Sequence, residues 1–561
     1  MDPLIIRNLI IENTIYSIVI VLFLLIASPS SYSIENKNIS NQDLIQFEQK
    51  QWLESAQRQR QNLKQKPRIA SDKPILISDD ENRCFTIESI NLIGMTVFLD
   101  KQKNKLIENY LGKCLTINNI QSIAQLIQNY YIKKGYITVQ VSLPEQDLTL
   151  KILTILIIEG IIESIEIQNS PTRTVNMIYP NLIGGILNLR DIEQGLEQLN
   201  RLNSYHYSID IQAGSKTGLS HLFIYRKGKK IPLASQLQLD NSGSKSNGEK
   251  QLNAGLIFDS LLGLGEQWSV SGNSDTDFST THFNHHYILG LNVPYGNWNY
   301  RYHLFNSRSF QTDKVDYQSF DYEVKNSNQY VEISRLIYRD AKQRVLVHGG
   351  LENKRVRIKF MEQLIDISSP ILTSIIFTAQ YNTVLSHGYF TFSPTFKQGI
   401  NAFGASPNIN VDDYPRSHFN KLSLNSSYQY FFSPKLSFLT SFHGQITRDN
   451  LYSVEQIHLG GQYSVRGFKA QMLSGNQGFY WRNDINYLLP KPIIGALTLV
   501  DAWDLGYQAK GDEFISGGAI GINFNHKSGI NSQLIASIPF YYPKNYQPDH
   551  WSLYWSVSLS L

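Results

Sequence analysis

Between about residue 231 and residue 561, apolar and polar side chains alternate with a period of two. The alternation is plain at Leu237 and Leu239, and over Trp298 to Leu304, Leu422 to Tyr430 and Trp551 to Leu561. Successive side chains of a β-strand point to opposite faces, so this period predicts strands with one apolar, aromatic face and one polar face. Turn-forming residues separate the stretches, which is typical of antiparallel hairpins.

The period alone leaves two architectures open. In a soluble multi-sheet domain the apolar faces would point into a core, whereas in a transmembrane barrel they would meet lipid. The last stretch, in which every second residue from Trp551 to Leu561 is apolar, favours a barrel whose closing strand pairs with its first. At about 20 residues per strand and connection, the roughly 330 residues available predict about 16 transmembrane strands.

The segment before the barrel contains an α/β unit that occurs twice. In 84–158, strand-like residues around Ile90 and from Ile137 to Val141 flank a helical pattern through Ile123 and Ile127. In 159–230 the same order returns. A repeat of about 70 to 75 residues predicts two small domains, each with a three-stranded sheet under two helices. The free edge of such a sheet is able to accept an extended peptide as an added strand.

The first 83 residues suggest export and a connection. Residues 1–33 carry an apolar stretch, Ile18 to Ala27, followed by serines, and are expected to be a signal peptide cleaved near Ser33. A membrane-anchoring helix is the alternative, although the stretch is shorter than the roughly 17 residues that a span needs. Residues 35–65 predict a polar helix that lacks a full apolar stripe, and 66–83 read as a linker.

The two cysteines of the chain fit an exported protein. In an oxidising periplasm, Cys84 and Cys114 are able to close a loop of about 30 residues, which contributes on the order of 3–4 kcal/mol. Two separate buried thiols remain the alternative.

Composition narrows the function. The chain has a formal net charge of only +4 and 17% charged residues, which offers no large basic field for nucleic acid. It contains no His-Glu-x-x-His motif, no Gly-rich phosphate loop and no Gly-x-Ser-x-Gly elbow, and its 13 histidines are scattered. We therefore expect no enzyme, no cofactor and no metal.

Several motifs together resemble the two-partner secretion transporters, the hemolysin activator and filamentous hemagglutinin exporter family. The resemblance covers nearly the whole mature chain, and its order and spacing are more specific than any single motif. It is carried by Cys84-Phe85, Gly112 to Leu115, Gly135 to Thr138, Leu143-Pro144, Ile158 to Gly160, Glu197 to Ser204, Asp240 to Gly243, Gly263 to Gln267 and Val465 to Phe468.

The resemblance implies an architecture and a site. The α/β units are similar to POTRA domains, and the helix in 35–65 would plug the barrel. A long loop would fold into the lumen with its tip Val465, Arg466, Gly467 and Phe468, and Arg466 would pair with the acidic residue of an x-x-Asp-x-Gly motif.

Asp504 of the sequence Ala-Trp-Asp-Leu-Gly fits that motif, while Asp501 lies close enough to compete. Strand parity favours Asp504, because Asp501 falls on the same side as Trp503 unless a bulge intervenes. A surface position for Arg466 with no partner is the alternative. Arg482 and Asp484 share one face, where they either extend the charged network or simply line a wet channel.

The family implies a function in the bacterial outer membrane. A monomeric barrel surrounded by lipid, with its POTRA domains in the periplasm, would bind one unfolded exported partner and pass it to the cell surface without nucleotide hydrolysis. The partner would be an adhesin, a cytolysin, a contact-dependent toxin or an iron-acquisition protein. A barrel-assembly insertase is the alternative, although two POTRA units and a plug argue against it. A passive porin is the third candidate, and the α/β repeat argues against that.

Overall fold

A computed structural model of the chain describes residues 42–64, 84–228, 231–243, 248–315, 318–409, 411, 413–469, 472–489, 496–509, 511–544 and 546–561. The expected signal peptide and the expected linker lie outside these residues. Within the described part of the chain, none of the helices has the length and apolar character needed to cross a membrane.

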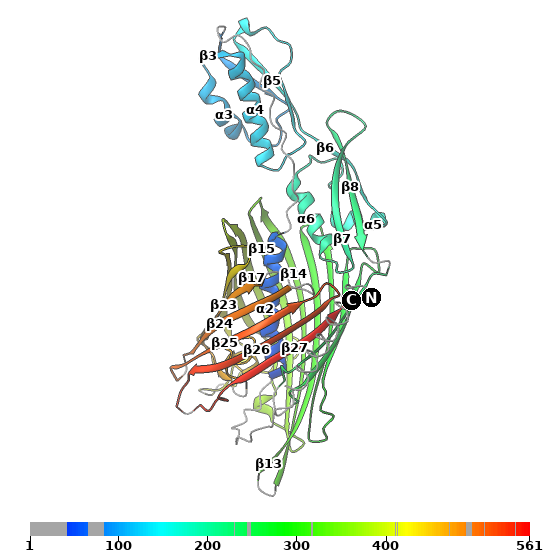
Figure 1. Cartoon of the computed structure of the whole chain (residues 1–561). Helices are drawn as coiled ribbons and strands as arrows, with labels where there is room; N and C mark the ends of the chain where they lie inside the picture. Colours follow the sequence, from blue (N-terminus) through cyan, green and yellow to red (C-terminus); the bar gives the residue numbers. More distant parts are fainter. Residues whose placement is uncertain are drawn as a thin grey trace, which may run out of the picture. The chain divides into compact units, whose positions relative to one another are not determined.

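The C-terminal part is a closed antiparallel barrel (Figure 1). Among the described residues it has 16 wall strands, because the two-residue β16 only prolongs the hairpin after β15, which itself pairs with β17. The strands are β9 (Leu233–Asp240), β10 (Gln251–Asp259), β11 (Gln267–Asp275), β12 (His282–Tyr295), β13 (Trp298–Val315), β14 (Gln318–Arg339), β15 (Gln343–Phe360), β16 (Gln363–Leu364), β17 (Ile371–Leu385), β18 (Gly388–Ile400), β19 (Asn420–Phe431), β20 (Leu436–Thr447), β23 (Gly478–Leu488), β24 (Ala496–Gln508), β25 (Glu513–Asn525), β26 (Ile530–Tyr541) and β27 (Ser552–Ser560).

The period-two pattern sets which side of each strand faces out. On β13, Tyr300 and Tyr302 are exposed on the outer face, whereas Phe305 is fully buried on the lumen face. The barrel closes where β27 pairs with β9, with Val557 opposite Leu239. The expected barrel of about 16 strands, with the last strand closing on the first, is confirmed.

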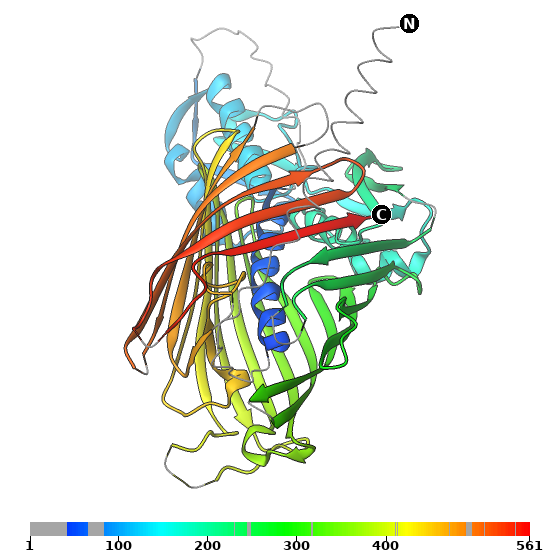
Figure 2. The same cartoon turned by 60° about the horizontal axis from the view of Figure 1, so that its bottom comes forward.

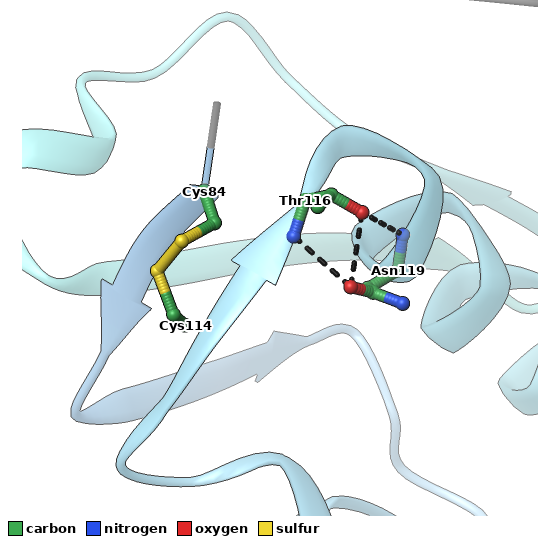
Figure 3. The surroundings of a disulfide bond; sticks show 4 residues. All are labelled: Cys84, Cys114, Thr116 and Asn119. Carbon is green, nitrogen blue, oxygen red and sulfur yellow. Dashed lines mark hydrogen bonds between the residues drawn. A yellow bond between two sulfur atoms is a disulfide. The ribbon is translucent and has the colours of Figure 1, made fainter. Parts of the chain in front are cut away.

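The first α/β domain contains β1 (Cys84–Ile87), β2 (Ser89–Ile93), α3 (Asp100–Ile107), β3 (Lys113–Thr116), α4 (Ile117–Lys133), β4 (Gln140–Ser142) and β5 (Ile152–Ile158). Its sheet has the order β2-β5-β4, and β1 pairs separately with β3. A disulfide joins Cys84 and Cys114 across that pair (Figure 3). Directly after β3, Thr116 and Asn119 form a capping box that starts α4, which places the helix over the sheet (Figure 3).

A buried carboxylate ties the end of this domain to its helices. Glu159 accepts hydrogen bonds from the backbone N–H of Thr96 at 2.9 Å, from that of Val97 at 3.1 Å and from the Tyr131 hydroxyl at 2.5 Å. Burial raises the pKa of Glu159, but these hydrogen bonds to its charged form outweigh burial and hold the pKa below its ordinary value of 4.5.

The second α/β domain contains β6 (Ile161–Ile167), α5 (Thr172–Ile178), α6 (Leu189–Asn200), β7 (Tyr205–Ala213) and β8 (Leu219–Gly228). Its sheet has the order β6-β8-β7, with β6 parallel to β8. Thus both units carry a three-stranded sheet with two helices, and the predicted fold class is confirmed.

Two local predictions in the first domain are wrong. The single strand expected through Ile90 is split at Glu88 into β1 and β2, which belong to different sheets. The strand expected from Ile137 to Val141 is confined to β4, because Ile137 packs against the core of the second domain instead of joining the first sheet.

Helix α2 (Gln42–Lys64) precedes both domains in the sequence, yet its contacts are with the inner wall of the barrel (Figure 2). Its Phe47 stacks on Phe305 of β13 at 4.9 Å between ring centroids, and its Trp52 stacks on His443 of β20 at 4.0 Å. The polar lumen explains why a helix without an apolar stripe is stable there.

Candidate functional site in the barrel lumen

The segment between β20 and β23 folds into the barrel instead of forming a simple turn. It contains the short strands β21 (Ile457–Leu459) and β22 (Leu473–Gly475), which pair with each other. Between them lies the tip of the loop, where Val465, Arg466 and Phe468 are almost completely buried.

Arg466 is held by two carboxylates. Its Nε donates to Oδ2 of Asp504 at 2.6 Å, and its Nη2 donates to Oδ1 of the same residue at 2.6 Å. The backbone N–H of Arg466 also donates to Oδ2 of Asp504, at 3.0 Å. Nη1 donates to Oδ1 of Asp484 at 2.6 Å. A bidentate ion pair with a second counter-charge is among the strongest polar contacts available to an arginine.

Two glycines permit this close approach. Gly467 has φ +100°, and a Cβ there would lie 2.6 Å from the carbonyl oxygen of Ile538 on β26. A Cβ on Gly517 would also collide with the carbonyl oxygen of Arg466. Gly517 lies at a register shift of the β25–β26 ladder, which opens the wall at the point where the tip touches it.

Phe468 anchors the tip by apolar contact. It is fully buried in a cluster inside the lumen, and its ring centroid lies 5.8 Å from that of Tyr546. The cluster also contains Ile457, Leu459, Val465, Tyr480 and Ile515.

The neighbouring residues singled out in the sequence have different positions. Arg482 donates through Nη1 to the carbonyl oxygen of Gln462 at 2.7 Å, so it holds the backbone of the loop rather than an acid. Asp501 is exposed on the outer face of β24, and the ladders on both sides of it run without a register shift. The bulge that would have turned Asp501 inward is therefore absent from the described strand.

A cluster of buried charges that sequence reasoning missed lies deeper in the lumen. We call it the lumen ion cluster; its members are Glu48 of α2, Glu352 and Lys354 of β15, Lys397 of β18, Lys421 of β19 and Glu455 of the loop. Lys354 Nζ lies 2.7 Å from Glu48 Oε1 and 3.0 Å from Glu455 Oε1. Glu455 also accepts from Lys397 at 2.6 Å and from Lys421 at 2.8 Å. One carboxylate of the helix and one of the loop thus share the same buried lysine.

Helix α2 is fastened to one side of the lumen. Besides Glu48, its Gln49 donates to the carbonyl oxygen of His458 in the loop at 2.9 Å, and its Arg60 donates to Ser427 of β19 at 2.6 Å. On the opposite side, between α2 and strands β9 to β12, a polar cavity of about 200 Å³ remains.

The second α/β domain contacts the turns at one end of the barrel. Glu197 of α6 pairs with Arg339 at 2.7 Å and with Arg344, which flank the β14–β15 turn. Thr174 donates to the carbonyl oxygen of Gly263 at 2.7 Å. These contacts mark the barrel end that faces the two domains.

The fold and this lumen site define a class: a barrel with two α/β domains at one end and a helix and loop inside. Comparison with known proteins places the chain within that class. The family model described as haemolysin secretion/activation protein ShlB/FhaC/HecB matches residues 218–524, and models of the ShlB-type POTRA domain and of the POTRA domain match 85–160 and 161–213.

Relatives match over most of their length. The outer membrane transporter CdiB of Dickeya dadantii is 33% identical over 96% of this chain and 98% of its own. The hemolysin transporter protein HpmB of Proteus mirabilis is 28% identical over 76% of each chain. The solved structure of CdiB from Escherichia coli aligns with a TM-score of 0.89 and 31% identity, covering 94% of this chain and all of that one.

The chain belongs to the haemolysin secretion/activation family of two-partner secretion transporters. Its barrel lies in the bacterial outer membrane and its POTRA domains lie in the periplasm. The barrel end that contacts the second POTRA domain is consequently the periplasmic end.

Proposed function

We propose that this protein carries one exported partner across the outer membrane and that the lumen ion cluster couples the plug helix to the inward loop. The partner enters unfolded from the periplasm, α2 and the loop leave their positions, and the chain passes through the barrel. No nucleotide motif occurs in the sequence, so the driving force that we propose is folding of the partner outside the cell.

The observation that carries the proposal is Lys354. Its ammonium group is 2% exposed and contacts Glu48 on the helix and Glu455 on the loop. Withdrawing α2 removes one counter-charge from a buried lysine and leaves the rest of the cluster with an excess positive charge. Breaking a buried pair in this way is strongly unfavourable, which links movement of the helix to rearrangement of the loop.

The test is single-channel conductance of the purified barrel in planar bilayers. Deleting residues 35–65 is expected to raise the conductance from brief small openings to a large steady current, because α2 occupies the lumen. Glu48→Gln is expected to increase the fraction of time spent open. Glu54→Gln on the same helix is the matched control, because Glu54 is only 3.9 Å from Lys50, its neighbour on the helix surface. Unchanged conductance in the deletion would refute the plugged state.

Partner secretion tests the loop separately. Arg466→Ala is expected to abolish secretion while the barrel remains inserted and heat-modifiable on gels, since 16 wall strands do not depend on the loop for their hydrogen bonds. Normal secretion by this variant would remove the loop tip from the mechanism.

We propose that the partner docks first on the POTRA domains by adding a strand to a free sheet edge. The edge strands are β2 and β4 in the first domain and β6 and β7 in the second. An unfolded segment gains main-chain hydrogen bonds along such an edge without needing a fixed side-chain sequence. Removal of residues 161–228 is expected to eliminate binding of an unfolded partner segment, and unchanged affinity would exclude docking there.

A further inference from the structure

Strands β12 to β15 carry a concentration of basic residues on the outer face of the barrel. Arg308 of β13 lies directly opposite Lys325 of β14, and Lys325 lies directly opposite Arg357 of β15. His285 of β12 continues the row on the other side of Arg308. Three permanent positive charges therefore stand side by side on neighbouring strands.

The adjoining rows add to this charge. Arg355 and Lys359 flank Arg357 on the same face of β15, two residues away on either side. Within these three rows the one acid is Glu323, which lies 2.6 Å from Arg308 and 3.1 Å from Lys325. We call Arg308, Lys325, Arg355, Arg357 and Lys359 the outer basic patch. Among the described residues, Arg357 has no acidic partner.

Like charges directly opposite in a sheet destabilise it by about 0.2–1 kcal/mol per pair. The patch nevertheless has an ordered geometry: the Arg308 guanidinium lies 5.2 Å from the ring centroid of Phe283, and Phe283 stacks on Phe310 at 5.5 Å. A fixed row of cations that repel one another is stabilised by an external anion. Arginine forks match the oxygens of a phosphate particularly well.

The height of the patch identifies where that anion would be. Strand β13 begins at Trp298, beside the turn whose Gly296 N–H donates to Met177 of the second POTRA domain, so this end is periplasmic. Ten residues further, at about 3.4 Å per residue and a tilt of about 40°, Arg308 lies roughly 26 Å higher. The apolar band of an outer-membrane barrel is about 25 Å tall, so the patch lies at its outer edge.

The wall below the patch faces lipid. Tyr300, Tyr302, Val331 and Ile333 are 37% to 48% exposed on the same outer face of β13 and β14. The patch continues this surface without a change of face. The groups that meet it are therefore headgroups of the outer leaflet, which in bacterial outer membranes is built from phosphorylated glycolipid.

We propose that the outer basic patch is a binding site for the phosphate groups of an outer-leaflet glycolipid. The lipid's acyl chains lie against the apolar wall of β13 and β14, and its phosphates neutralise the row of Arg308, Lys325 and Arg357. Bound lipid then stabilises the part of the barrel where β13, β14 and β15, of 18, 22 and 18 residues, extend beyond the apolar band.

The test uses the full-length protein in detergent, stripped of lipid, with thermal unfolding as readout. The probe is purified lipid A carrying its phosphates, and the other arms are the same lipid after enzymatic dephosphorylation and inorganic phosphate at equal concentration. The variant is Arg308→Gln with Lys325→Gln and Arg357→Gln. The matched control neutralises Arg335, Lys342 and Lys435, three exposed basic residues at the periplasmic end.

Phosphorylated lipid A is expected to raise the Tm of the natural protein and of the control, and the patch variant is expected to lose most of that shift. Without lipid, the variant should be as stable as the natural protein or more so, because charge repulsion is removed. If the triple variant does not assemble, Arg357→Gln alone carries the comparison.

Three results would overturn the proposal: an undiminished shift in the patch variant, an equal shift from dephosphorylated lipid, or an equal shift from inorganic phosphate. Loss of binding of the secreted partner by the patch variant, with its response to lipid A intact, would assign the patch to the partner instead.

Discussion

Replacing Asp504 with asparagine should release the loop from the lumen. The substitution keeps the shape of the side chain but removes the charge that faces Nε and Nη2 of Arg466 at 2.6 Å each. The amide nitrogen that replaces one oxygen cannot accept from the guanidinium. Arg466, which is 2% exposed, is then left with Asp484 as its remaining counter-charge.

The size of the effect follows from this geometry. Removing one partner of a buried ion pair costs about 3–5 kcal/mol. Because Asp484 still contacts Nη1, we expect the lower end, about 3 kcal/mol. At about 1.4 kcal/mol per tenfold change, the equilibrium between the seated loop and the released loop shifts by roughly two orders of magnitude.

Limited proteolysis on intact cells reports the position of the loop. Lys469 lies three residues after Arg466, and its side chain is only 9% exposed, so trypsin should cleave there only when the loop is released. Asp504→Asn is expected to be cut much faster than the natural protein and to secrete less partner. Asp501→Asn, on the outer face of the same strand, is the matched control. Equal cleavage and equal secretion in the two variants would refute the reasoning.

Three further predictions follow from single contacts. Gly467→Ala should also make the loop sensitive to trypsin, because its Cβ would lie 2.6 Å from the carbonyl oxygen of Ile538 at a φ of +100°; resistance equal to that of the natural protein would contradict this. Glu48→Gln should weaken retention of α2 in the lumen, since Lys354 loses a counter-charge at 2.7 Å, and hydrogen exchange of the helix would detect it. The depressed pKa of Glu159 contributes stability to the first POTRA domain above about pH 4.5, and that stability is lost as the pH falls through the lower folded-state pKa. Glu159→Gln should therefore remove this acid dependence, measured as the thermal stability of the domain between pH 3 and pH 7, and an unchanged pH profile would contradict the assignment.

The sequence by itself determined the barrel, because alternation with a period of two is a local property of each strand. Trp298 to Leu304 already shows which residues face out, and the length of the region sets the number of strands. The same parity separated Asp504 from Asp501 before any contact was known, and the structure places Asp504 on Arg466 and Asp501 on the outer face.

Tertiary structure decided which distant charges meet. Glu48, Lys354 and Glu455 come from a helix, a strand and a loop that are hundreds of residues apart, and each by itself resembles an ordinary surface charge. The outer basic patch has the same origin, since Arg308, Lys325 and Arg357 become neighbours only through the register of three strands. A periodic pattern records the environment of one residue, whereas an ion pair depends on the closure of the barrel and the path of the loop, which no local pattern contains.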